Sequence, residues 1–182
     1  MYRKCATELS AQHQKQVTAS LLELMQKIPF EDITVTQLCQ TAGISRRIFY
    51  HLFPNKTDAL YALVDQAILS IESYRPDLPD EILRFCLYCR DQKPLFDALH
   101  ENGLSNLLLE RMLINILDEA YDIRYWLKAY DRDTGTDIII FNLCGIMGLI
   151  YGWYYTDFQK SPETLAHRIH HLIQKPLFPK EL

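Results

Sequence analysis

Residues 33–56 read ITVTQLCQTAGISRRIFYHLFPNK, and their pattern predicts two short helices joined by a tight turn. Thr34 and Gln37 have the spacing of a capping box, which predicts the start of a short amphipathic helix. Gly43 tolerates a positive φ and ends that helix, while Ser45 is a good N-cap for the next one. Two short helices joined in this way are typical of a helix-turn-helix.

The second of these helices, expected over residues 46–53, has two different sides. At about 100° per residue, one side carries the apolar residues that we expect in the core, namely Ile48, Phe49, Leu52 and Phe53. The other side carries groups that bond phosphates and base edges, namely Arg46, Arg47, Tyr50 and His51. The charged side could instead be an ordinary solvated surface with no binding role. An exposed Tyr50 beside Arg46 and Arg47 favours a binding surface.

Basic residues stand at two helix starts, where the helix dipole disfavours them. Arg46 and Arg47 follow the cap Ser45. Lys56 follows the N-cap of the next helix, and Thr36 adds a hydroxyl in the first turn of the helix before. Free N–H groups with added positive charge suit an anion. DNA is favoured because its backbone repeats such anions at fixed spacing.

Composition and charge agree with this interpretation. The chain has 182 residues, only 6 Gly and 8 Pro, and almost no alternation of β-branched residues, so we predict an all-α fold. Residues 1–56 carry seven basic and four acidic side chains, a net charge of +3, whereas the remaining residues carry −7. A basic head on an acidic body offers one end of the protein to a polyanion.

The quoted stretch resembles the DNA-binding domain of the TetR family of bacterial transcriptional regulators. The similarity lies in the Ala-Gly-apolar-Ser turn, the Phe-Tyr pair, and the Phe and Lys that follow, and it covers about residues 10–65. It implies a homodimer that binds double-stranded DNA at a near-palindromic operator. The residues that it assigns to DNA are Thr36, Ser45, Arg46, Arg47, Tyr50, His51 and Lys56. Leu52 departs from the family, which usually has His or Tyr there, and we expect it in the core.

The rest of the chain is expected to be helical after a linker. Residues 75–80 read RPDLPD, and two prolines so close together cannot continue a helix. We predict helices over residues 80–91, 94–101, 104–130, 136–157 and 162–174. We divide the chain into a helix-turn-helix domain (1–55), a connecting helix (56–75) and a regulatory and dimerisation domain (76–182). Segments at residues 88–99, 145–153 and 161–163 resemble the subgroup that includes regulators of dihydroxyacetone kinase operons.

Residues 138–155 carry no charge, which reaches the lower edge of membrane-span length. The aspartates at both flanks and the lack of a basic cluster favour a buried helix instead. The regulatory domain has few helices to cover it, so we predict a dimer held by helices 136–157 and 162–174. We assign the interface to Gly145, Gly148, Gly152 and Trp153, since the three glycines form a smooth stripe within about 60°.

Cys86 and Cys89 form a Cys-x-x-Cys, followed by His100. A metal- or redox-sensing protein built on these residues is the alternative function. Core packing is favoured because no second cysteine pair follows at zinc-finger spacing, and we expect no metal and no cofactor.

No catalytic motif is visible, so we do not expect an enzyme. The five cysteines are scattered and no secretory signal is visible, which favours reduced thiols and a cytoplasmic bacterial protein.

The regulatory half is rich in aromatic residues, which typically line small-molecule pockets beside a few polar groups. We therefore expect a small-molecule effector, or else a partner protein, although some of these rings can equally be core. The candidate effector residues are Phe85, Tyr88, Phe96, His100, Asn115, Tyr121 and Tyr125.

Overall fold

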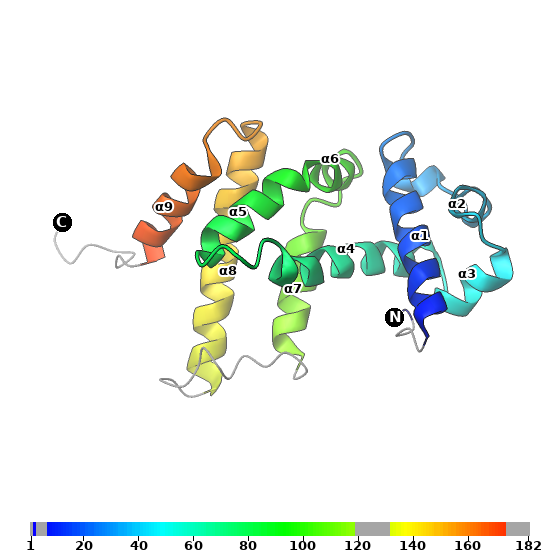
Figure 1. Ribbon diagram of the computed structural model, residues 1–182, viewed down its shortest axis with the longest axis horizontal. Helices are drawn as coiled ribbons and strands as arrows, with labels where there is room; N and C mark the ends of the chain where they lie inside the picture. The colour runs from blue at the N-terminus through cyan, green and yellow to red at the C-terminus, as the bar shows by residue number, and fades with distance from the viewer. Residues whose placement is uncertain (1, 3–6, 119–131, 174–182) are drawn as a thin grey trace. The chain divides into compact units, whose positions relative to one another are not determined.

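The computed structural model describes residue 2, residues 7–118 and residues 132–173. These residues form nine α-helices and one short 3-10 helix and contain no strand (Figure 1). The predicted all-α fold is confirmed.

Contacts divide the chain into two compact units. The first unit comprises Met1–Ser70 and Pro94–Arg111, and the second comprises Ile71–Lys93 and Met112–Leu182. Residues 94–111 therefore pack with the N-terminal residues, although they follow the proline-containing linker. The functional division at residues 55 and 75 stays a prediction.

The N-terminal part of the chain forms α1 (Glu8–Met25), η1 (Phe30–Asp32), α2 (Val35–Ala42), α3 (Arg46–Leu52) and α4 (Lys56–Ser73). The end of α4, from Ile71 on, belongs to the second unit. Helix α1 begins at Glu8 because the Thr7 side chain caps it, accepting a hydrogen bond from the Ser10 N–H. Helices α1, α2 and α3 pack on one another (Figure 1). Their fully buried side chains include Val17, Leu21, Leu38 and Phe49.

The remaining helices are α5 (Glu81–Asp91), α6 (Lys93–Glu101), α7 (Leu107–Leu117), α8 (Arg132–Tyr155) and α9 (Pro162–Ile173). The helix predicted over residues 104–130 begins only at Leu107, since Gly103 adopts a φ of +69° and turns the chain. Its predicted part after residue 118 lies outside the described residues.

In the second unit, α5 packs against α8 and α9. The core there includes Cys86, Met147, Ile150 and Ile169. Asp80 caps α5 by accepting from the Leu83 N–H at 3.0 Å, and its carboxylate also lies 2.9 Å from Nε2 of His170 on α9.

Helix α8 is distinctive among the described helices. It is long and apolar enough to cross a membrane, although core helices pass the same test. Only 17% of its apolar window is buried. One side of this helix, which includes Phe141, Gly145, Gly148 and Gly152, is exposed in the described part of the chain.

Candidate nucleic-acid interface

The turn between α2 and α3 forms as the sequence predicts. Thr34 and Gln37 make the capping box, with the Gln37 N–H donating to Thr34 Oγ1 at 3.2 Å and the Thr34 N–H donating to Gln37 Oε1 at 2.9 Å. Gly43 has a φ of +66° and ψ of 28°, and the Ile44 N–H donates to the Cys39 carbonyl at 3.0 Å. This left-handed conformation disfavours any residue with a Cβ, which is why glycine stands there.

Helix α3 is anchored by one side, as predicted, although Ile48, which was expected in the core, is only half-buried. Ser45 Oγ accepts from the Ile48 N–H at 3.2 Å and caps the helix. Phe49 is fully buried, Leu52 is 4% exposed, and the Phe49 ring lies 5.5 Å from that of Phe53. Leu52 therefore belongs to the core.

The opposite side of α3 faces solvent. Arg46, Arg47, Tyr50 and His51 are all exposed, with 49% of Tyr50 accessible. Thr36 on α2 is exposed as well. The Arg46 guanidinium lies 5.9 Å from the Tyr50 ring centroid. Within the described residues neither arginine is paired with a carboxylate, so both charges are available to an anion.

Lys56 is placed differently from the other candidates. Its Nζ donates to the backbone carbonyls of Phe30 at 2.8 Å, Glu31 at 2.6 Å and Ile33 at 3.1 Å. An ammonium has three donors, so these bonds use all of them. A phosphate contact by Lys56 stays a prediction and would require it to give up one of these bonds.

Two solved structures resemble the chain over most of its length. A TetR transcriptional regulator from Streptococcus agalactiae 2603V superposes with a TM-score of 0.62 at 14% identity, over 92% of this chain and 96% of its own. The dihydroxyacetone kinase operon activator DhaS superposes with a TM-score of 0.58 at 19% identity, over 88% of this chain and 93% of its own.

The chain has the fold of the TetR transcriptional regulators. No protein-family model and no curated protein matches its sequence, so the likeness rests on structure. Both structural relatives are named as regulators of transcription rather than as enzymes.

In this TetR fold the candidate effector residues fall in both units. Phe96 and His100 belong to the first unit, whereas Phe85, Tyr88 and Asn115 belong to the second. Tyr88 and Phe96 are buried, and the Tyr88 ring packs edge-on against Tyr74 at 5.4 Å. Tyr121 and Tyr125 lie outside the described residues. An effector site stays a prediction.

The cysteine pair lies in the core of the second unit. Cys86 and Cys89 are buried. Burial, aided by the nearby Asp80 and Glu163 carboxylates, raises the pKa of Cys86 to about 12, and burial raises the pKa of Cys89 well above its ordinary value. Both are thus protonated thiols at neutral pH, which disfavours metal binding and redox chemistry. His100 belongs to the other unit, and no group of three metal-ligating side chains occurs in the described ranges.

The three glycines predicted to lie at a dimer interface are on an open side of α8. A Cβ added at Gly145, Gly148 or Gly152 would meet no atom within 4 Å. Trp153 lies elsewhere: it is 3% exposed, and its Nε1 donates to the Lys160 carbonyl at 2.9 Å. The reason is geometric, since Trp153 is rotated by about 100° from Gly152 and faces the unit's own core.

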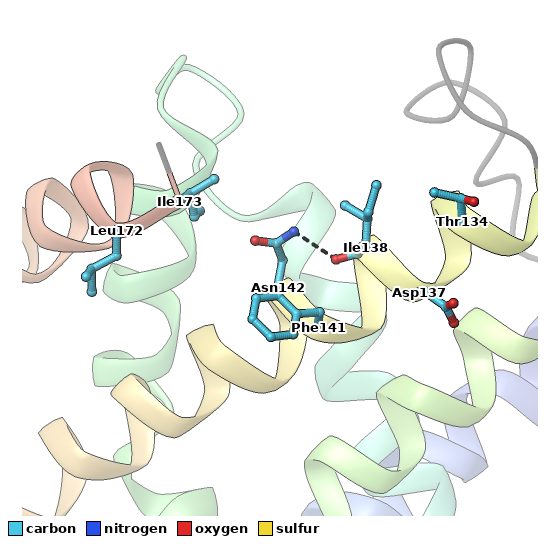
Figure 2. Close-up of a pocket in the computed structure, with 7 residues that line it drawn as sticks. All are labelled: Thr134, Asp137, Ile138, Phe141, Asn142, Leu172 and Ile173. Carbon is cyan, nitrogen blue, oxygen red and sulfur yellow. Dashed lines mark hydrogen bonds between the residues drawn. The ribbon is translucent and has the colours of Figure 1, made fainter. Parts of the chain in front are cut away.

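An open groove runs along the same side of α8 and beside α9 (Figure 2). Its lining residues are Thr134, Asp137, Ile138, Phe141 and Asn142 from α8, and Leu172 and Ile173 from α9. Phe141 and Leu172 are 56% and 52% exposed. Sequence reasoning missed these side chains, although Phe141 lies within the uncharged stretch. We call Ile138, Phe141, Leu172, Ile173 and the three glycines the α8–α9 apolar face.

Proposed function

We propose that this protein is a sequence-specific DNA-binding regulator of transcription. The observation that carries the proposal is the exposed side of α3, where Arg46, Arg47 and Tyr50 face solvent while Phe49 and Leu52 anchor the helix from below. A guanidinium can bind phosphate or the edge of guanine in two-point contacts. The net charge of +3 on residues 1–56 adds a general attraction to DNA.

The proposal includes a homodimer on a near-palindromic operator. It is supported by the α8–α9 apolar face, whose exposed Phe141 and Leu172 have no cover in the described chain. A second copy can cover an apolar face with its own identical face in a two-fold arrangement. Such a dimer would present two α3 helices to half-sites about 34–36 Å apart.

An effector would act on this regulator by changing how often the two α3 helices have the spacing that fits DNA. A small molecule or a partner protein can do so only if it binds more tightly to the dimer with this spacing than to the dimer with another spacing, or the reverse. DNA must then change the affinity for the effector by the same factor.

Selection of binding sites from a randomised pool of duplex DNA tests the proposal. We expect the full chain to enrich a near-palindrome. Arg47→Ala should weaken binding to this site and reduce the slope of log affinity against log salt, because one phosphate contact is lost in each half-site. Arg90→Ala removes an exposed arginine from α5 and should select the wild-type site. Enrichment of no sequence by the wild-type chain would contradict the proposal.

A further inference from the structure

A segment far along the chain contacts the loop that leads into the helix-turn-helix. Residues 94–111 pack with Met1–Ser70 in one compact unit. Leu95, Phe96 and Leu99 are buried in this segment. The polar contacts made where α6 ends reach the loop that leads into α2.

The key residue is Asn102, which follows the last residue of α6. Its Nδ2 donates to the carbonyl of Ala98 at 2.7 Å and to the carbonyl of Met25 at 3.4 Å. Its Oδ1 accepts a hydrogen bond from the Phe30 N–H. Met25 ends α1 and Phe30 begins η1, so one amide side chain joins the two ends of the α1–η1 connection.

Lys56 contacts the same loop through other backbone groups. We call residues 26–33 the Phe30 turn. Lys56 at the start of α4 donates to three carbonyls of the turn, and its Nζ lies 4.8 Å from the Phe30 ring centroid. Ile33 is the last residue of the turn and directly precedes Thr34, the N-cap of α2. The position of the Phe30 turn therefore sets where α2 begins, and α2 packs on α3.

We infer that Asn102 is a positioning residue for the DNA-binding surface, acting through the Phe30 turn. This inference rests on the proposed function. Asn102 lies outside the helix-turn-helix and carries no charge, so it adds nothing to the attraction between the protein and phosphate. Its loss frees the Phe30 N–H and the Met25 carbonyl and lets the turn and α2 shift. The two α3 helices of a dimer then spend less time in the arrangement that fits DNA.

The test measures the affinity of the full chain for its selected DNA at several salt concentrations, under conditions in which circular dichroism shows every variant folded. Asn102→Ala should weaken binding roughly 2- to 30-fold, the range observed for coupling residues that touch no ligand. The slope of log affinity against log salt should stay at the wild-type value, because no phosphate contact is lost. Asn106→Ala, which removes an exposed amide from the same segment, should bind like the wild type.

If Asn102→Ala does not fold, the same affinity measurement is made on Asn102→Asp. It keeps an acceptor for the Phe30 N–H and loses the donor to Met25, and Asn106→Asp controls for the added charge. Weaker binding than this control would support the inference. Equal affinity of wild type and Asn102 variants would overturn it, as would a changed slope for Asn102→Ala. Absence of DNA binding by the wild type would instead overturn the proposed function.

Discussion

Helices α3 and α8 both leave one side to solvent, but the chemistry of the two sides is opposite. Helix α3 has 7 residues and exposes arginines beside a tyrosine, while its buried side is fixed by Phe49. Helix α8 has 24 residues and exposes Phe141 and a glycine stripe. The first surface suits a polyanion, and the second suits another apolar surface. The sequence of an amphipathic helix predicts which side is exposed. The sequence of a helix that is apolar all round does not predict which other helix or subunit packs against it.

Helix α2 is capped by Gly43 and helix α8 contains Gly148, and substitutions at these two glycines separate local backbone conformation from packing between subunits. A Cβ added at Gly43 or at Gly148 would meet no atom within 4 Å. Gly43 has a φ of +66°, however, and Gly148 lies within a regular helix. Side chains at the two positions should therefore have opposite effects on the stability of the single subunit.

The largest effect is expected for Gly148→Leu. The bulky side chain should force two α8 helices apart in the dimer, at a cost of roughly 1–3 kcal/mol or more. The subunit itself should gain up to about 1 kcal/mol, because leucine favours a helix more than glycine does. Sedimentation at micromolar concentration should show a folded monomer, and thermal unfolding should show that its fold is intact. Gly148→Ala should weaken the dimer less, and a Gly148→Leu dimer as tight as the wild type would contradict the interface.

Gly43→Ala should have the next largest effect. Alanine must adopt the left-handed conformation, which costs about 1–2 kcal/mol. Denaturant unfolding should show this loss of stability, and Gly43→Asn should recover part of it because asparagine tolerates that conformation better. An alanine variant as stable as the wild type would mean that the turn does not need glycine.

Asp80→Ala should have the smallest effect, about 1 kcal/mol from the lost N-cap of α5. Burial alone would raise the pKa of Asp80, but hydrogen bonds from the Leu83 N–H and His170 outweigh it and lower the pKa below the ordinary value of 3.8. Ionised Asp80 thus stabilises the fold above about pH 4, and this stability is lost as pH falls through the lower, folded pKa. The unfolding free energies of wild type and variant, followed between about pH 2 and pH 6, should converge toward acid. A difference that does not depend on pH would refute the role of the charged carboxylate.

The sequence predicted features that depend on neighbouring residues. The capping box at Thr34, the cap Ser45 and the turn at Gly43 are local signals, and each is found where it was predicted. The burial of Leu52 followed from the helix period alone.

Features that depend on distant residues could not be predicted. The contact of Asn102 with Phe30 joins residues 72 positions apart, and no periodicity encodes it. Trp153 was assigned to the open side of α8, because a helix that is apolar all round does not reveal which side faces its own core. The groove could not be predicted either, because its lining comes from two helices, α8 and α9, whose packing the sequence pattern does not give.

The salt dependence of DNA binding tests whether the exposed side of α3 binds the DNA backbone. If Arg46 and Arg47 of two subunits each contact one phosphate, the four contacts predict a slope of about −4 for log affinity against log salt, or about −5 with a further contribution from Lys56. The double variant Arg46→Ala/Arg47→Ala should lose most of this slope together with its affinity for the selected site. Wild-type binding that is indifferent to salt, or a double variant with the wild-type slope, would contradict the account.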